Sequence, residues 1–205
     1  MKGYVAIAVA VILSAASLPY VYQIWRRQVV PTLSTWIIFV VATSLNAVSY
    51  LVATRWDIIS GVLGLTDALV SWFILIIIVL STGYKVQWQT FEKYYLAASG
   101  VIVLFWMISR SAFVTNILMQ LLITAGCAAT IQSLLGASEN HESFLFWGLV
   151  LVASTLSLYP AAVEGNLLAL IYALRSIVIV CVILSLMFRL HRTTRAMLQP
   201  GFRQQ

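Results

Sequence analysis

Charged residues are scarce in this sequence: Asp, Glu, Lys and Arg together make up 9% of its 205 residues. Soluble domains carry about 25% of these residues, so the chain has too little charge to cover a water-exposed surface. Hydrophobic residues account for 62% of the sequence, and the mean hydropathy is +0.99. The composition therefore predicts an integral membrane protein whose main partner is the lipid bilayer.

Residues that carry enzyme chemistry are also few. The two cysteines, Cys127 and Cys181, both lie within apolar runs, where they are expected to act as small apolar side chains. The two histidines, His141 and His191, lie in a loop and in the tail, so the sequence holds no histidine cluster for a metal. A retinal protein needs a lysine inside its last helix, and the lysines here are Lys2, Lys85 and Lys93. With no Gly-rich phosphate loop and no nucleophile elbow either, we expect no enzyme activity, no cofactor and no metal.

Seven apolar runs fill most of the chain, and each is bounded by charged or turn residues. A run of about 20 residues is long enough to cross the ~30 Å hydrocarbon core of a bilayer as a helix. The first run is too long and too aromatic at its end for a cleaved signal peptide, so we expect it to be retained. The runs are 4–25, 33–54, 58–80, 94–109, 112–135, 144–162 and 167–188.

Lysine and arginine are unevenly distributed between the two sides of the predicted membrane. If the seven runs alternate in direction, one side holds Arg26, Arg27, Lys85, Lys93, Arg189, Arg192, Arg195 and Arg203, and the other holds Lys2, Arg55 and Arg110. Cytoplasmic loops carry an excess of basic residues, so the C-terminus is predicted to be cytoplasmic and the N-terminus outside. The basic tail is explained by nearby anionic lipid, and we expect no nucleic-acid partner. The type of membrane and a homo-oligomeric state are left open.

The chain also contains an internal repeat. Residues 41–46, Val-Ala-Thr-Ser-Leu-Asn, match residues 152–157, Val-Ala-Ser-Thr-Leu-Ser, at an offset of 111. This offset spans four runs, an even number, so both copies cross the membrane in the same direction. The pattern predicts an all-α integral membrane fold of seven transmembrane helices, arranged as two parallel triple-helix repeats around a linker helix, a plan known among transporters. The predicted units are residues 1–82 for the first repeat, 83–111 for the loop and linker helix, 112–190 for the second repeat and 191–205 for the basic cytoplasmic tail.

Two short segments resemble the PQ-loop and SWEET superfamily of seven-helix membrane proteins. Residues 18–27, Leu-Pro-Tyr-Val-Tyr-Gln-Ile-Trp-Arg-Arg, precede a Ser-containing helix start at 31–36, and residues 130–133 and 142–147 look like a second copy. The resemblance implies the 3+1+3 fold and a role in moving or binding a small solute. Family members include sugar uniporters, exporters of cystine and cationic amino acids, and a receptor for retrieval peptides.

The sequence departs from the family pattern at two positions. Tyr20 stands where the family's glutamine follows Pro19, and Ala129 stands where the second copy has a proline. Pro19 removes a backbone hydrogen bond and is expected to kink its helix, as a hinge or as a passive bend. Trp36 and Trp147 match each other at the offset of 111 and belong either to the interfacial aromatic belt or to a gate.

Two charges lie inside the predicted membrane. Asp67 lies ten residues into the third run and Arg175 nine residues past Asn166, so each is about 14 Å deep at a ~1.5 Å rise per residue. A charge at that depth costs about 2.5 to 3.5 kcal/mol, so such residues face a cavity or each other. We predict that Asp67 and Arg175 lie on opposite walls of one central cavity, either as a structural ion pair or as a site for an ionic or protonatable group.

Other polar residues within the runs complete the predicted substrate site. Each of them taken alone is explained as a contact between helices, and the cluster is what indicates a cavity. They are Thr43, Asn46, Asn116, Gln120, Ser157 and Tyr172. We predict a carrier for a small polar solute, amino-acid-like and proton-coupled, that alternates access between two triple-helix bundles. A non-transporting ligand or peptide receptor of the same fold and a sugar uniporter are the alternatives.

Overall fold

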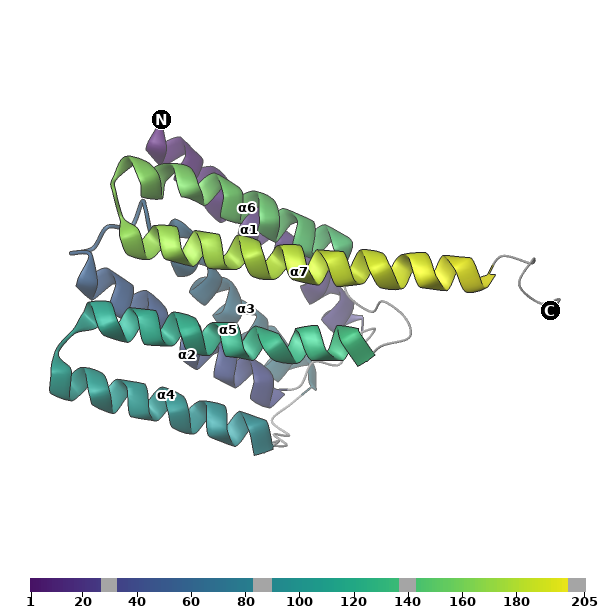
Figure 1. The fold of residues 1–205 in the computed structure, drawn as a ribbon, viewed down its shortest axis with the longest axis horizontal. Coiled ribbons are helices and arrows are strands. Elements are labelled where there is room, and N and C mark those ends of the chain that lie inside the picture. The colour runs from purple at the N-terminus through teal and green to yellow at the C-terminus, as the bar shows by residue number, and fades with distance from the viewer. Residues whose placement is uncertain (27–32, 83–89, 137–142, 199–205) are drawn as a thin grey trace.

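The computed structural model describes residues 1–26, 33–82, 90–136 and 143–198. Within these ranges all regular secondary structure is helical, as predicted, and Figure 1 shows the helices lying side by side. Predictions that involve Arg27, Lys85 and Arg203 lie outside the described residues. The helices are α1 (Lys2–Trp25), α2 (Leu33–Ala53), α3 (Val62–Thr82), α4 (Thr90–Ser109), α5 (Ala112–Gly136), α6 (Phe144–Val163) and α7 (Leu167–Leu198).

Five of these helices, α1, α2, α3, α6 and α7, are long and apolar enough to cross a membrane. In α4 and α5 the described apolar stretches are shorter, at Lys93–Ser109 and Ala112–Cys127. Helices of this length and composition are typical of an integral membrane protein, which agrees with the low charge of the sequence. Crossing by all seven helices stays a prediction.

The third helix begins later than the sequence predicted, at Val62 instead of residue 58. Arg55 and Trp56 adopt positive φ angles of 53° and 68°, which end any helical path through this segment. The carboxylate of Asp57 then accepts a hydrogen bond of 3.1 Å from the backbone amide of Ser60. This turn replaces the first helical turn that the apolar pattern indicated.

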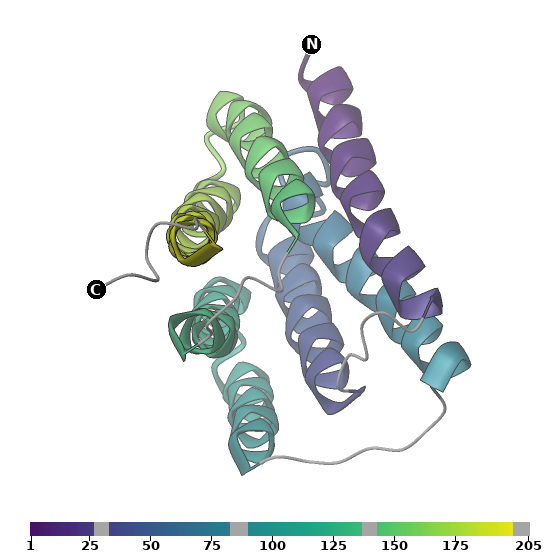
Figure 2. The same cartoon turned by 90° about the vertical axis from the view of Figure 1, so that its right-hand side faces the viewer.

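The helices pack in a regular order. Helix α3 packs against both α1 and α2, and α7 packs against both α5 and α6. Helix α1 also packs on α6, and α2 on α5, so the first three described helices meet the last three along two seams. Helix α4 packs against α5 and α2 at the edge of the bundle, where Figures 1 and 2 show it outermost.

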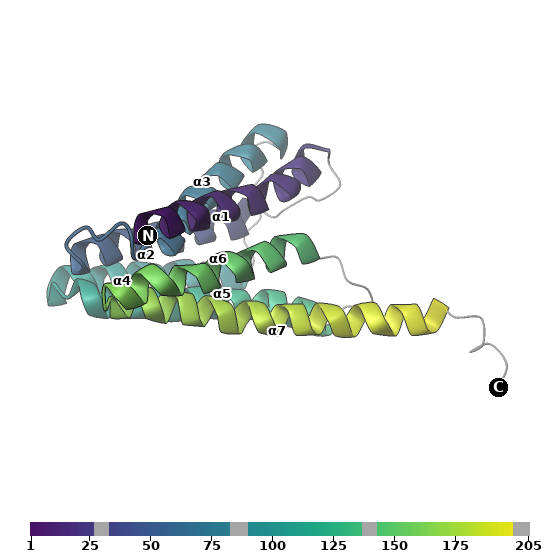
Figure 3. The ribbon, with the colours of Figure 1, turned by 90° about the horizontal axis from the view of Figure 1, so that it is seen from above.

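The two ends of the bundle are packed differently. At the end that holds the N-terminus, the N-terminal end, one apolar cluster joins Tyr50 of α2 to Ala161 of α6 and Leu168 of α7. At the opposite, C-terminal end, one cluster around Ile78 contains only residues of α1, α2 and α3. Another, around Met187, contains only residues of α5, α6 and α7. Figure 3 shows α1 and α3 diverging from α7 toward this end.

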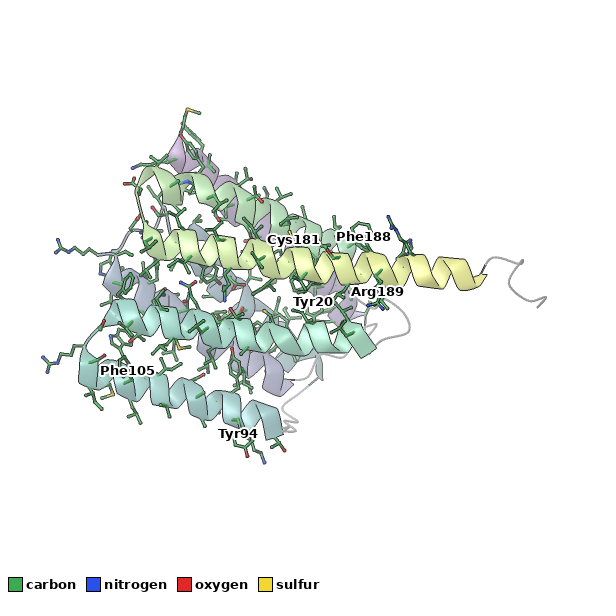
Figure 4. The ribbon with its side chains drawn as sticks, in the orientation of Figure 1. Tyr20, Tyr94, Phe105, Cys181, Phe188 and Arg189 are labelled. Carbon is green, nitrogen blue, oxygen red and sulfur yellow. The ribbon has the colours of Figure 1, made fainter. Side chains whose placement is uncertain are left out.

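Helix α7 extends beyond the rest of the bundle. Its 32 residues span about 48 Å, which exceeds the ~30 Å hydrocarbon core. Figure 4 shows Phe188 and Arg189 where α7 leaves its neighbours, and Tyr94 on the outer side of α4. The exposed apolar side chains of the bundle, Phe188 and Tyr94 among them, are those that a bilayer would cover.

Candidate functional site

The centre of the bundle holds a network of polar side chains. Asn116 of α5 is fully buried, and its Nδ2 donates to the backbone oxygen of Asn46 at 2.9 Å and to Asn46 Oδ1 at 3.0 Å. The same nitrogen lies 3.2 Å from Ser49 Oγ. Gln120, one turn along α5, donates from Nε2 to Asn116 Oδ1 at 2.8 Å. We call Asn46, Ser49, Asn116 and Gln120 the central network; it joins α2 to α5, and it contains three of the predicted site residues.

The two predicted intramembrane charges, Asp67 and Arg175, lie on either side of Tyr172 at the edge of this network. The Tyr172 hydroxyl donates to Asp67 Oδ2 at 2.6 Å, and the Arg175 guanidinium lies 4.3 Å from the centre of the Tyr172 ring. Arg175 Nη1 also donates to the backbone oxygen of Gln120 at 3.3 Å, which links the charges to the central network. No ion pair between Asp67 and Arg175 is found within the described residues, so these charges are bridged by an aromatic ring instead of touching.

Asp67 lies nearer to its helix start than the sequence predicted. Because α3 begins at Val62, Asp67 is its sixth residue, about 8 Å along the helix, whereas Arg175 is the ninth residue of α7, about 12 Å along. The two side chains still lie close together. Tyr172, one turn before Arg175 on α7, contacts both of them. Position along a helix does not give depth in the membrane, so equal depth stays a prediction, whereas both charged side chains lie against the same residue, Tyr172.

Two buried polar atoms of this region have no partner in the part of the chain that the structure describes: Gln120 Oε1 and Arg175 Nε. The first accepts hydrogen bonds and the second donates them. A buried polar group without a partner costs about 1 to 3 kcal/mol, more when it is charged. Such atoms at the centre of an apolar bundle are suited to bind a solute or water that carries both a donor and an acceptor.

Two other predicted site residues use their hydroxyl groups within their own helices. Thr43 donates to the backbone oxygen of Phe39 at 2.7 Å, and Ser157 donates to the backbone oxygen of Ser154 at 2.7 Å. Both are buried at the bundle interior. They therefore line the interior of the bundle without belonging to the central network.

A small cavity lies beside the central network, between α2, α3 and α7. Its volume is about 10 Å³, which is close to the minimum that holds one water molecule. Its polar lining comes from Asn46, Tyr50, Ser60 and Tyr172. Asp67 and Arg175 do not line it, so this cavity is not the shared one that the sequence predicted.

A second polar cluster, at the N-terminal end, was not predicted as a site. Asn166 Nδ2 donates to Asp57 Oδ2 and to the Tyr50 hydroxyl, both at 2.8 Å, and the Tyr50 hydroxyl donates to the backbone oxygen of Asp57 at 3.1 Å. We call Tyr50, Asp57, Ser60 and Asn166 the N-terminal cluster. Asp57 and Asn166 each accept a bond from a backbone amide three residues on, at Ser60 and Ala169, so a helix-cap pattern was the sequence signal for them.

The charge of Asp57 is stabilised by this cluster. Partial burial by itself would raise the pKa of the Asp57 carboxyl group. Hydrogen bonds from Ser60 and Asn166, and the positive charge of Lys2, outweigh burial and lower the pKa below its ordinary value. Lys2 also forms an ion pair with Glu164, which ties the start of α1 to the turn between α6 and α7. The N-terminal end is thus closed by polar contacts as well as by apolar packing.

The predicted hinge and gate residues lie near the C-terminal end. The Tyr20 ring, next to Pro19, lies 5.7 Å from the Trp36 ring and 6.4 Å from the Phe146 ring, centre to centre. Phe146 lies 5.2 Å from Trp147. The two tryptophans are therefore connected by a row of aromatic rings that crosses from α2 through α1 to α6. The hydroxyl of Ser17 bonds the backbone oxygen of Ser14, one residue before the carbonyl that Pro19 leaves unpaired.

Comparisons with protein-family models, with curated proteins and with solved structures find no match. Any function assigned to these residues therefore rests on their own geometry and chemistry.

Proposed function

We propose that this protein is a membrane carrier for a small polar, amino-acid-like solute, with Asp67 and Arg175 at its binding site. The observation that carries the proposal is the grouping of Asp67, Tyr172 and Arg175 inside an apolar bundle, beside two polar atoms that have no partner among the described residues. Ionisable residues at such positions are expensive and mark the paths of substrates or protons. A solute with a carboxylate and an ammonium group would complement both charges, whereas a neutral sugar requires neither.

The proposed architecture is seven transmembrane helices in a 3+1+3 parallel repeat. The helix packing supports it, because the main pairs of neighbouring helices are unchanged when α1, α2 and α3 are exchanged for α5, α6 and α7, although the minor contact between α3 and α6 has no comparable counterpart among the described residues. The exchange replaces α1 by α5 and α6 by α2. The contact between α1 and α6 therefore becomes the contact between α5 and α2, and both contacts are present. Helix α4 has no counterpart in the exchange, which suits a linker that restores the direction of the chain. The resemblance to the PQ-loop and SWEET superfamily is proposed on the same grounds.

The proposed mechanism is alternating access by rocking of the two triple-helix bundles. Apolar and polar contacts join the bundles at the N-terminal end, whereas each bundle has its own apolar cluster at the C-terminal end. In a carrier that is closed to one side of the membrane, the two bundles are likewise joined at the closed end and packed separately at the other end. In the proposed cycle the row of rings from Trp36 to Trp147 separates to admit solute, and Pro19 supplies the bend.

Solute flux into liposomes tests the proposal. The purified chain is reconstituted and assayed with labelled acidic, neutral and basic amino acids and with sugars, with and without a pH gradient. We expect flux of an amino acid, reduced at least tenfold in Asp67→Asn and in Arg175→Gln. Lys93→Gln, a charge change at an exposed residue outside this site, is the matched control and should leave flux unchanged.

Each alternative function has its own result in this assay. Saturable binding without flux would support a receptor of the same fold and overturn the carrier. Sugar flux that neither charge substitution alters would support a uniporter.

The proposed orientation, N-terminus outside and C-terminus in the cytoplasm, has a separate test. A reporter enzyme that is active only in the cytoplasm is fused after Gln205. Activity is expected because basic residues concentrate on that side. An inactive fusion, together with activity of a reporter placed before Met1, would reverse the orientation.

A further inference from the structure

The small cavity lies between the N-terminal cluster and the central network. Tyr50, which belongs to the N-terminal cluster, lines the cavity on one side. Asn46 of the central network and Tyr172, the partner of Asp67, line it as well. A cavity of about 10 Å³ accommodates one water molecule when two to four polar groups surround it. The cavity therefore separates two sets of hydrogen-bonded polar groups: Tyr50 with the N-terminal cluster on one side, and Tyr172 with Asp67 on the other.

The groups around the cavity match the hydrogen-bonding needs of one water molecule. Asn46 Oδ1 accepts from Asn116, whereas Asn46 Nδ2 donates to no atom of the described residues and is available to a water oxygen. This nitrogen lies 3.6 Å from the point where a Cβ on Gly64 would lie, and Gly64 is part of the cavity wall. The hydroxyls of Tyr50 and Tyr172 already donate, to the backbone oxygen of Asp57 and to Asp67 Oδ2, so each can accept a hydrogen bond from the water.

We propose that this cavity holds one ordered water and that the water completes a proton relay from the N-terminal end to Asp67, through Tyr50 and Tyr172. The relay rests on the proposed function, because a proton-coupled carrier needs a proton route. Tyr172 passes its hydroxyl proton to the Asp67 carboxylate, to which it already donates at 2.6 Å, and takes a proton from the water. The Tyr50 hydroxyl turns from the backbone oxygen of Asp57 to the water and gives it a proton, and in the proposed relay Tyr50 then regains one at the N-terminal end, where Asp57 is partly exposed. One proton moves inward, and each relay oxygen loses one proton and gains one.

Protonation of Asp67 would change the charge of the site. The ionisable groups that face Asp67 are Tyr172 and Arg175 of α7 and Cys127 of α5. With a carboxylate at Asp67 and a guanidinium at Arg175 the local charge is balanced. A proton on Asp67 leaves the Arg175 charge unbalanced, which favours binding of an anionic group of the solute. The relay therefore couples proton entry to solute binding.

The substitution Gly64→Ala is designed to remove the water and keep every hydroxyl group. Its added methyl group would lie 3.4 Å from the Tyr172 ring and 3.6 Å from Asn46 Nδ2, which are ordinary contact distances, so the fold should be retained. That methyl group occupies space that the water needs. Gly100→Ala, on α4, has no atom within 4 Å of its added methyl group and is the matched control.

Hydroxyl-radical footprinting tests the water site, because bound water generates radicals beside buried side chains. We expect Tyr172 to be labelled several-fold more than Tyr95, although both are 6% exposed, since Tyr95 does not line the cavity. Gly64→Ala should bring the labelling of Tyr172 down to that of Tyr95, and Gly100→Ala should not. Equal labelling of the two tyrosines in the native chain would overturn the water site.

Time-resolved infrared spectroscopy after a pH jump tests the relay. The carbonyl band that disappears in Asp67→Asn reports protonation of Asp67. We expect its rise to slow at least tenfold in Gly64→Ala and in Tyr172→Phe and to keep the native rate in Gly100→Ala. Native rates in both relay variants would overturn the relay. Because neither measurement uses solute flux, a protein that shows the relay but moves no solute would contradict the proposed carrier and leave the relay intact.

Discussion

Asn116 is expected to be the side chain on which the contact between α2 and α5 depends most. It is fully buried, and its two Nδ2 hydrogens serve three acceptors on α2, at 2.9, 3.0 and 3.2 Å. Asn116→Leu keeps the volume roughly constant and removes these bonds. Hydrogen bonds between membrane helices contribute about 0.6 kcal/mol on average and up to about 1.7. Because Asn116 Nδ2 has two hydrogens, the loss of two such bonds is expected to lower the free energy of unfolding by about 1 to 3 kcal/mol.

The loss can be measured by reversible unfolding in mixed detergent micelles, with helix content as the signal. Thr43→Val is the matched control, because Thr43 is just as buried but its hydroxyl bonds only to its own helix. We expect this control to change the free energy of unfolding by less than about 0.5 kcal/mol. Equal stability of Asn116→Leu and the native chain would refute the reasoning, and so would an equal loss in both variants.

Two further predictions concern the N-terminal end. Gly61→Ala should lower the unfolding midpoint, because the added methyl group would overlap the Tyr50 ring, whereas Gly148→Ala, with open space around it, should not. The Asp57 pKa is lowered in the folded chain, so its stabilising effect is present above the ordinary pKa of about 4 and is lost as the pH falls through the lowered pKa. Unfolding midpoints measured from neutral to acidic pH should show this loss in the native chain and a smaller one in Asn166→Ala; parallel profiles would contradict it.

Much of the helical framework was predictable because it depends on local composition. Each apolar run is long enough to satisfy its own backbone hydrogen bonds, so α1, α2, α6 and α7 begin within two residues of the predicted positions. Two starts differ from the prediction by four residues: α4 begins early, at Thr90, and α3 begins late, at Val62. The start of α3 has a structural reason. It depends on a turn in which Asp57 bonds Ser60 and Asn166, and the second of these partners is 109 residues away. A contact at that separation leaves no periodic pattern in the sequence.

The residues of the candidate site were likewise predictable only in part. Asp67 and Arg175 were recognised from the sequence because a charge within an apolar run is costly wherever the run packs. That Tyr172 lies between them, and that Gln120 contacts Arg175, depends on which faces of α3, α5 and α7 meet. Equally polar residues such as Thr43 were left outside the central network by the same packing.

By itself, then, the sequence determined that the chain is apolar and helical and that two charges lie within apolar runs, because each of these properties depends on local composition. Only the tertiary structure decided which polar atoms meet. It paired Asn116 with Asn46 and Asn166 with Asp57, and it left a water-sized cavity beside Tyr172. Hydrogen bonds act over about 3 Å and require direction, so their partners are set by the packing of whole helices.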